Sequence, residues 1–203
     1  MIFFASLLSV FLISGSLLGH PVIWKGGLVL SSKFTSNINE IKTHYSLNRS
    51  WALGLHSISF NQQYYYMLQN NLLVKRWNSK GSQGNLYLFS GIGSNVTKNP
   101  EAIGHLGIQS DWETRRIYTQ FSMDHYPKKQ PITLLSGRLG IAPYLTDFDG
   151  IHTWVILQLD QVIKVNQSET TIMPLFRFFK DNLLLECGSN FNNKYLLTFM
   201  FHI

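Results

Sequence analysis

The final nine residues of the sequence, Tyr195-Leu196-Leu197-Thr198-Phe199-Met200-Phe201-His202-Ile203, decide the predicted fold. Counted back from the carboxyl end, every second residue is large and apolar: Ile203, Phe201, Phe199, Leu197 and Tyr195. A period of two residues is typical of a β-strand that has one apolar face. The pattern runs to the last residue, so we expect no following segment to cover that face.

This terminal strand resembles the C-terminal signal of Gram-negative outer-membrane β-barrels, which the barrel-assembly machinery recognises. In that family the last residue is usually Phe, whereas here it is Ile203, with Phe201 two positions earlier. The resemblance implies an outer-membrane location, contact with outer-membrane lipid, and the barrel-assembly machinery as a partner during biogenesis. It also implies an assembly signal made of five side chains: Tyr195, Leu197, Phe199, Phe201 and Ile203.

The composition of the 203-residue chain favours the same class. Charged residues make up 14%, aromatic residues 14% and hydrophobic residues 45% of the sequence. The charged fraction is well below the roughly 25% of ordinary soluble domains. Beyond the amino terminus there is no uninterrupted apolar run of about 18 residues, so no spanning helix is expected there. A low charged fraction, with the apolar residues distributed over many short segments, is typical of a membrane barrel. The chain length suits a single domain.

The formal net charge of +6 does not predict a nucleic-acid partner. Lys and Arg occur singly or in pairs and never in a run of five or more, so we expect no binding to nucleic acid. The only cysteine, Cys187, excludes an internal disulfide. None of the seven histidines has a metal-binding spacing, although His44, His56 and His105 share the predicted inner face. We expect neither a metal nor a cofactor.

The amino-terminal segment predicts a signal peptide over residues 1–19. Residues 2–13 are almost entirely apolar, and small residues follow at Ser14, Gly15, Ser16 and Gly19. A run of this length followed by small residues is typical of a secretory leader. A retained membrane helix is the alternative. Residues 20–203 then form the barrel domain.

From Trp24 onward, short alternating segments are separated by polar turns. We predict an all-β fold, a single antiparallel up-and-down transmembrane barrel of twelve strands, with ten strands as the alternative. An even number lets both termini lie on the periplasmic side. The expected strands have about the length that crosses a bilayer at barrel tilt. They cover residues 26–34, 39–47, 51–60, 64–77, 85–95, 103–114, 116–126, 132–145, 153–165, 171–179, 183–191 and 195–203.

The middle of the chain shows the alternation most clearly. Along residues 103–114, Leu106, Ile108 and Trp112 share one face, and the other face is polar. A soluble β-sandwich has the same period, with its polar side chains facing water instead of a lumen. The leader, the low charge and the apolar last strand favour the membrane barrel. Aromatic residues near strand ends fit interfacial girdles.

The expected inner face carries charges of both signs. We interpret them either as a salt-bridge network that fills the lumen or as a charged constriction in a narrow pore. The candidate residues are Lys75, Asp111, Glu113, Arg116, Asp124, Arg138, Asp160, Lys164, Arg177 and Glu186.

We therefore expect a non-catalytic integral outer-membrane protein that acts as a narrow channel or as a structural component of the envelope. One alternative is an outer-membrane lipid-modifying hydrolase. His56 and Ser57 invite that comparison, but adjacent strand residues point to opposite faces and cannot pair unaided. A second alternative is a soluble periplasmic barrel that binds an apolar ligand.

Overall fold

The computed structural model describes residues 20–203 with the exception of residues 61, 97–98 and 148, so the predicted signal peptide lies outside the described residues. Within the described part, no helix is long and apolar enough to span a membrane. The chain forms twelve β-strands: β1 (Leu28–Thr35), β2 (Ile38–Ser46), β3 (Trp51–Phe60), β4 (Gln63–Ser79), β5 (Ser82–Asn95), β6 (Ala102–Thr114), β7 (Ile117–Tyr126), β8 (Ile132–Ile141), β9 (His152–Lys164), β10 (Gln167–Lys180), β11 (Leu183–Ser189) and β12 (Tyr195–His202).

The strands form a closed antiparallel barrel. Each strand pairs with its neighbours in the sequence, and β12 closes the ring by pairing with β1. In that closing seam Leu30 lies opposite Phe201 and Phe34 opposite Leu197. The prediction of an all-β barrel with twelve strands is confirmed. We call the end where β1 begins and β12 finishes the terminal end, and the other the opposite end.

Two strand boundaries differ from the prediction for local reasons. Strand β8 stops at Ile141 instead of residue 145, because Pro143 has no amide hydrogen to continue the ladder. The expected link over residues 78–84 is much shorter: β4 and β5 stay paired until Ser79 meets Ser82. Gly81 takes a φ of 85° in this tight turn, a conformation that glycine adopts without steric cost.

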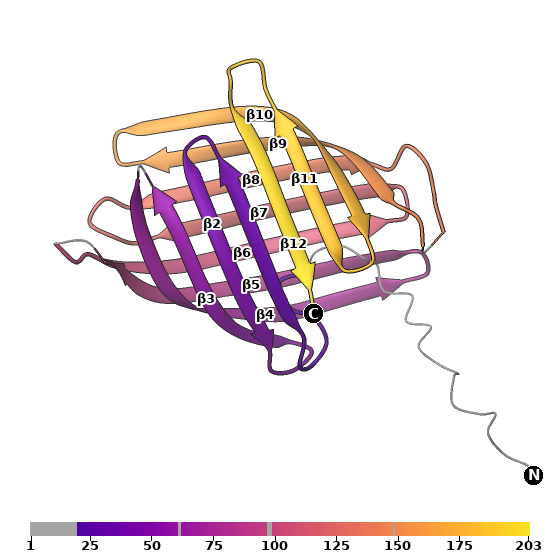
Figure 1. The fold of residues 1–203 in the computed structure, drawn as a ribbon, viewed down its shortest axis with the longest axis horizontal. Coiled ribbons are helices and arrows are strands. Elements are labelled where there is room, and N and C mark those ends of the chain that lie inside the picture. Colours follow the sequence, from indigo (N-terminus) through magenta and orange to yellow (C-terminus); the bar gives the residue numbers. More distant parts are fainter. Residues whose placement is uncertain (1–19, 61, 97–98, 148) are drawn as a thin grey trace, which may run out of the picture.

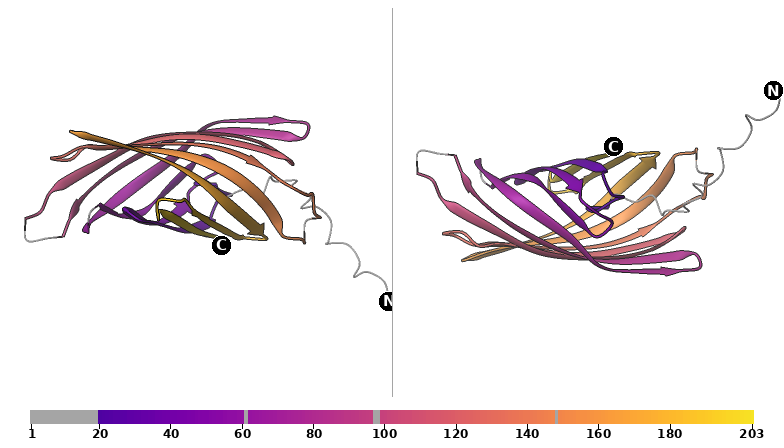
Figure 2. Two further views of the ribbon diagram at one scale, coloured as in Figure 1. Left: turned by 90° about the horizontal axis from the view of Figure 1, so that it is seen from above. Right: turned by 90° about the horizontal axis from the view of Figure 1, so that it is seen from below.

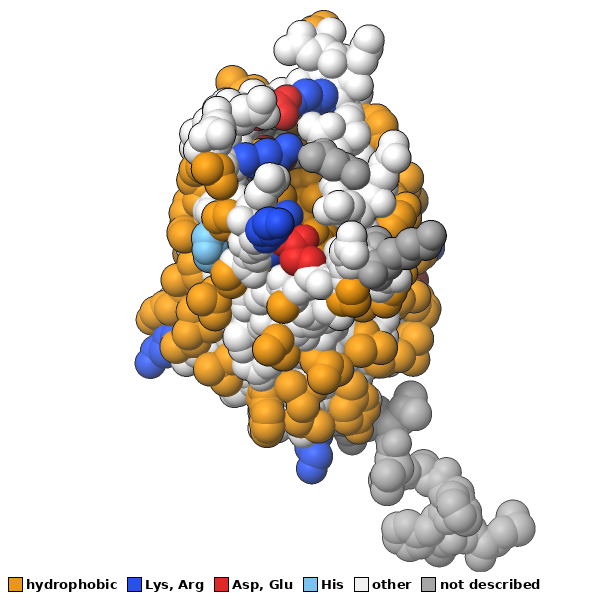
Figure 3. Space-filling model, turned by 90° about the vertical axis from the view of Figure 1, so that its left-hand side faces the viewer, with side chains coloured by type: hydrophobic (Ala, Val, Ile, Leu, Met, Phe, Trp, Pro, Cys, Tyr) orange, Lys and Arg blue, Asp and Glu red, His pale blue; other side chains and the backbone are white. Residues whose placement is uncertain are grey.

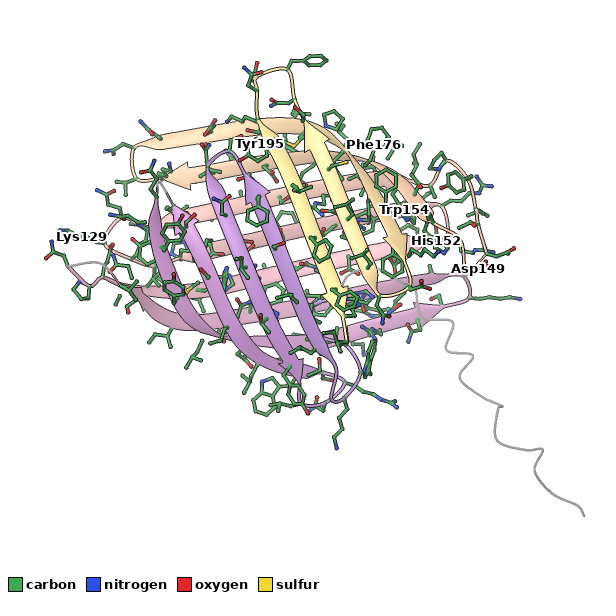
Figure 4. All side chains as sticks on the ribbon, in the orientation of Figure 1. Lys129, Asp149, His152, Trp154, Phe176 and Tyr195 are labelled. Atoms are coloured by element: carbon green, nitrogen blue, oxygen red, sulfur yellow. The ribbon has the colours of Figure 1, made fainter. Side chains whose placement is uncertain are left out.

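The barrel is flattened. Strands β11, β12, β1, β2 and β3 cross one side at a steep angle to the strands of the other side (Figure 1). The views from above and below show the two walls curving toward each other (Figure 2). Lys129, in the β7–β8 link, and Asp149, in the β8–β9 link, mark the opposite end and the terminal end respectively (Figure 4).

The outer surface is apolar. Leu68, Leu106 and Leu157 point outward and are 67%, 58% and 54% exposed. Hydrophobic side chains cover most of the flanks in the space-filling view (Figure 3). Exposed aromatic side chains occupy the outward positions near both ends, among them Trp51 and Trp112 at the terminal end. This is the distribution of a surface that meets lipid in the middle and headgroups at its two rims.

Apolar side chains also fill parts of the interior. One cluster lies on β3, β4 and β6 to β8 and includes Phe60 and Tyr126. A second joins β7, β9, β10 and β12 around Trp154. A third brings Val22, from the segment before β1, against inward side chains of β3 to β5. The lumen is therefore packed in these places, and the space that remains is polar.

Candidate functional site, a polar cavity in the lumen

The remaining space is a cavity of about 270 Å³, lined mainly by inward side chains of the strands. It reaches the β1–β2 turn and the beginnings of β10 and β12, all at the opposite end. Viewed from that end, the surface is hollowed, with acidic and basic side chains around the hollow (Figure 3). Five cationic and six anionic side chains line the cavity: Lys33, Lys42, Arg138, Arg177, Lys194, Glu40, Asp111, Asp124, Asp160, Glu169 and Glu186.

Side chains pack tightly at the terminal end of the lumen beside β3 to β5. Ala52, Asn85 and Tyr87 point inward at this end, and each is 0% exposed. The segment before β1 joins this packing, because Asn71 Nδ2 donates a hydrogen bond to the Pro21 carbonyl oxygen at 3.3 Å. In a lumen open at both ends these inward side chains would contact water. Side chains therefore fill the terminal end of the barrel interior beside β3 to β5.

An arginine–glutamate–arginine group lies deep in the cavity wall. The Nη1 atom of Arg138 lies 3.1 Å from Glu186 Oε1, and the Nε atom of Arg177 donates to the same oxygen at 2.7 Å. Glu186 and Arg177 are almost fully buried. The Arg177 guanidinium also lies over the Tyr118 ring, 4.3 Å from its centroid. Two guanidinium groups thus share one carboxylate, and the group keeps one net positive charge.

A second group combines acids, a lysine and histidines from β2, β3, β6 and β7. Lys42 Nζ lies 3.3 Å from Glu40 Oε2, and His56 Nε2 lies 3.8 Å from Glu40 Oε1. On the neighbouring wall, His105 Nε2 lies 2.7 Å from Asp124 Oδ1. The His56 and His105 rings meet edge to face at 5.6 Å. These contacts satisfy charges that would otherwise be costly to bury.

Amide side chains hold the third group together. Asn85 Nδ2 donates to Asp111 Oδ1 at 2.6 Å, and Arg76 Nε donates to Asn85 Oδ1 at 2.7 Å. Gln109 Nε2 donates to the other oxygen of Asp111 at 3.3 Å. Asp111 is therefore held by neutral donors, and its charge remains available to the cavity.

Inward glycines make room for the histidines and the glutamine of this wall. His44 lies opposite Gly54, and Gly54 lies opposite Gln69 on the next strand. Gln69 in turn lies opposite Gly91, which lies opposite His105. A Cβ atom at position 54 would come within 1.8 Å of the Thr43 carbonyl oxygen. Glycine at position 54 is thus a steric requirement, whereas a Cβ atom at position 91 would make a tight contact of 3.0 Å with the Leu68 carbonyl oxygen.

The mouth at the opposite end is tied by polar contacts. Lys194, in the β11–β12 link, pairs with Glu169 on β10, and the Tyr195 amide donates to Ser36 Oγ at 3.2 Å. In the β5–β6 link, Glu101 accepts hydrogen bonds from the Tyr65 hydroxyl at 2.8 Å and from the Lys129 amide at 2.8 Å. The Tyr65 hydrogen bond, with help from the Lys129 amide, lowers the pKa of Glu101 from its ordinary value.

The candidate charges predicted from the sequence fall into three sets. Six line the cavity directly: Asp111, Asp124, Arg138, Asp160, Arg177 and Glu186. Glu113 points inward and is buried near the terminal end of β6. Lys164 has the inward register at the last position of β9 but is not among the residues that line the cavity.

Two candidates lie outside the lumen, which corrects the prediction. The register shifts between Leu73 and Lys75, so that Lys75 pairs with outward Leu86 and is exposed. A β-bulge inserts one residue and reverses the faces that follow it. Arg116 is exposed in the turn between β6 and β7. The regular alternation of β7 begins only at Ile117, so it does not place Arg116 on the inner face.

Sequence reasoning missed other residues of the cavity. Lys33, Glu40 and Lys42 all line it. The alternation of the sequence could have revealed those on β2, because Glu40, Lys42 and His44 occupy every second position and apolar Ile41 and Tyr45 lie at the positions between. Arg76 does not line the cavity but donates to inward Asn85, and the bulge hid it, because simple alternation from Leu73 places it on the outer face.

The described residues offer little for metal or hydrolytic chemistry. No group of three or more His, Cys, Asp or Glu side chains within the described ranges is placed to hold a metal ion. His56 is buried in the lumen, whereas Ser57 occupies the outward register of β3. The residues of the predicted assembly signal line the outer face of β12 up to the end of the chain, and all are exposed: Tyr195, Leu197, Phe199, Phe201 and Ile203.

Comparison of the sequence with protein-family models and with curated proteins found no match. Among solved structures, a similar chain is OmpTdeltaL8, a loop L8 deletion mutant of OmpT, an outer membrane protein of Vibrio cholerae. The alignment covers 88% of this chain and 97% of that chain, with a TM-score of 0.36 and 8% sequence identity. A likeness this distant carries no argument about function, and the fold assignment rests on the closed order of the strands.

Proposed function

We propose that this chain is an integral outer-membrane β-barrel without catalytic activity whose lumen is a blind polar chamber open at the end opposite the termini. Its apolar flanks and the aromatic side chains near both rims support insertion into a bilayer. The observation that carries the blind chamber is the complete burial of Ala52, Asn85 and Tyr87 at the inner terminal end. Of the two roles expected from the sequence, a narrow channel or a structural component, this burial supports the non-conducting one.

The links between strands support a role that does not depend on large surface loops. The β1–β2, β3–β4 and β9–β10 connections at the opposite end each join strands that stay paired almost to the turn. Long extracellular loops are the usual carriers of adhesion and receptor specificity in barrels. We therefore propose that the specificity of this protein lies in the chamber.

The test is electrical. The barrel is folded in detergent, checked for heat-modifiable migration on a gel, and reconstituted into planar bilayers beside a pore of known conductance. We expect a folded protein that inserts into the bilayer and gives no steady conductance. Steady single-channel conductance of the folded protein would contradict the blind chamber. Failure of the folded protein to associate with lipid would contradict the membrane assignment.

A further inference from the structure

The charges of the chamber nearly cancel, yet some of them lack an ion-pair partner. Among the described residues that line it, cations and anions differ in number by one. A chamber selective for anions or for cations would carry an excess of one sign, as charged constrictions do. The near balance of signs instead suits a ligand that is neutral overall and carries both charges.

The positive end of such a ligand site is formed by two arginines. Arg138 and Arg177 share Glu186, so one guanidinium charge has no counter-charge of its own. Arg138 is the more accessible of the two, with 13% of its side chain exposed. A guanidinium presents several N–H donors in one plane and binds a carboxylate through two of them. Arg138 therefore keeps free donors directed at the chamber.

The negative end lies next to it on the neighbouring strand. Asp160 takes part in none of the ion pairs of the described residues, and its neutral neighbour Gln158 donates to it. Gln158 pairs in register with Arg138, which makes Asp160 the diagonal neighbour of Arg138. Diagonal neighbours on an antiparallel pair lie about 7–8 Å apart. Both side chains therefore enter the same part of the chamber, where one small molecule that carries both charges can reach them.

Two buried polar atoms elsewhere in the chamber also lack partners. Within the described structure, His44 Nε2 and Gln69 Oε1 are buried and accept or donate no hydrogen bond. Both residues line the cavity from β2 and β4. Buried polar atoms nearly always have a hydrogen-bond partner, so His44 Nε2 and Gln69 Oε1, like the other unpartnered inward atoms of the described barrel, are positions where water or a polar ligand can bind.

We propose that the chamber binds a small zwitterion of the α-amino-acid class. The carboxylate of the ligand lies against Arg138, and its ammonium group lies against Asp160. We assign to His44 and Gln69, which line the same chamber from β2 and β4, hydrogen bonds to a polar ligand side chain. This inference rests on the proposed function only in requiring a folded barrel with an accessible chamber.

Calorimetric titration of the detergent-folded barrel tests the proposal. The probes are a panel of polar α-amino acids, their methyl esters, which lack the carboxylate, and their N-acetyl derivatives, which lack the ammonium group. We expect saturable binding of at least one amino acid and a loss of tenfold or more in affinity for both of its derivatives. If no amino acid binds, or if both derivatives bind as well as the parent, the proposal is wrong.

Paired variants locate the site. Arg138→Gln and Asp160→Asn each remove one charge, and we expect each to lower the affinity tenfold or more. The matched controls are Arg116→Gln and Asp181→Asn, because both residues lie in turns outside the chamber. Unchanged affinity in the two chamber variants would contradict the proposed site. Arg138→Lys keeps the charge and retains partial affinity, which provides a test even if Arg138→Gln does not fold.

The same preparation separates this inference from the proposed function. Conductance together with zwitterion binding would overturn the blind chamber and leave the ligand site intact. Absence of both conductance and binding would overturn the ligand site and leave the blind chamber intact.

Discussion

Glu186 and Arg138 form an ion pair of 3.1 Å although β9 and β10 separate their strands in the barrel. Inward side chains of β8 and β11 meet because the barrel is flattened in cross-section, which brings side chains of non-adjacent strands together (Figure 2). Because Arg177 pairs with the same carboxylate, Glu186 on β11 links inward side chains of β8 and β10.

Glu186→Gln removes the shared negative charge and leaves two guanidinium groups in a largely buried place. Breaking a buried ion pair from one side costs about 3–5 kcal/mol of unfolding free energy. We expect a loss of that size in reversible urea unfolding of the barrel in lipid vesicles. Glu169→Gln is the control, because its exposed pair with Lys194 is worth about 1 kcal/mol or less. Equal losses for the two variants would contradict the assigned role of Glu186.

Gly54→Ala tests the steric role of the inward glycines. The new Cβ would come within 1.8 Å of the Thr43 carbonyl oxygen, which is backbone and cannot move aside without disturbing the β2–β3 pairing. We expect a strong loss of folded, heat-modifiable protein. Gly137→Ala is the matched control, since nothing lies within 4 Å of a Cβ there, and it should fold like the parent. Normal folding of both variants would show that this wall tolerates the added atom.

Leu157→Arg distinguishes a lipid-facing surface from a water-facing one. Leu157 is exposed near the middle of β9, where an arginine on the lipid face of a barrel costs about 2–4 kcal/mol. Val165→Arg, in the exposed β9–β10 turn, should have little effect on unfolding free energy in the same vesicles. A neutral effect of Leu157→Arg would mean that this flank faces water.

Glu101 provides a test of the mouth by pH. The Tyr65 hydrogen bond stabilises the carboxylate form and lowers the pKa of Glu101. A group with a lowered pKa stabilises the fold above its unfolded pKa, and that contribution is lost as the pH falls through the folded value. In Tyr65→Phe we expect the pKa of Glu101 to rise toward its ordinary value in a carboxyl-detected NMR titration. An unchanged titration curve would show that this hydrogen bond does not form in solution.

Much of this molecule is readable from its sequence, because a barrel wall obeys a period of two. The alternation of Leu106, Ile108 and Trp112 against His105 and Asp111 predicts both faces of β6 correctly. The rule fails where the backbone departs from regular pairing. After the bulge before Lys75, the residues at the end of β4 point to the faces opposite to those that alternation predicts. At the start of β7, the alternation begins only after the tight turn that contains Arg116.

The arrangement inside the barrel is not readable in the same way. Periodicity places Arg138, Arg177 and Glu186 on the inner face but says nothing about which of them meet. Their contact depends on the flattening of the barrel, which follows from the packing of distant strands. The packing at the terminal end depends likewise on Val22 and Pro21 meeting inward residues of β3 to β5.

Cysteine labelling in proteoliposomes tests the blind chamber most directly. With Cys187 on the outer face replaced by Ser, single cysteines are introduced at Thr171, near the mouth, and at Ala52, at the inner terminal end. We predict that a membrane-impermeant maleimide labels Thr171→Cys in the folded barrel and labels Ala52→Cys only after unfolding in urea. Equal labelling of both positions in the folded barrel would mean that the lumen is open from end to end, which contradicts the blind chamber.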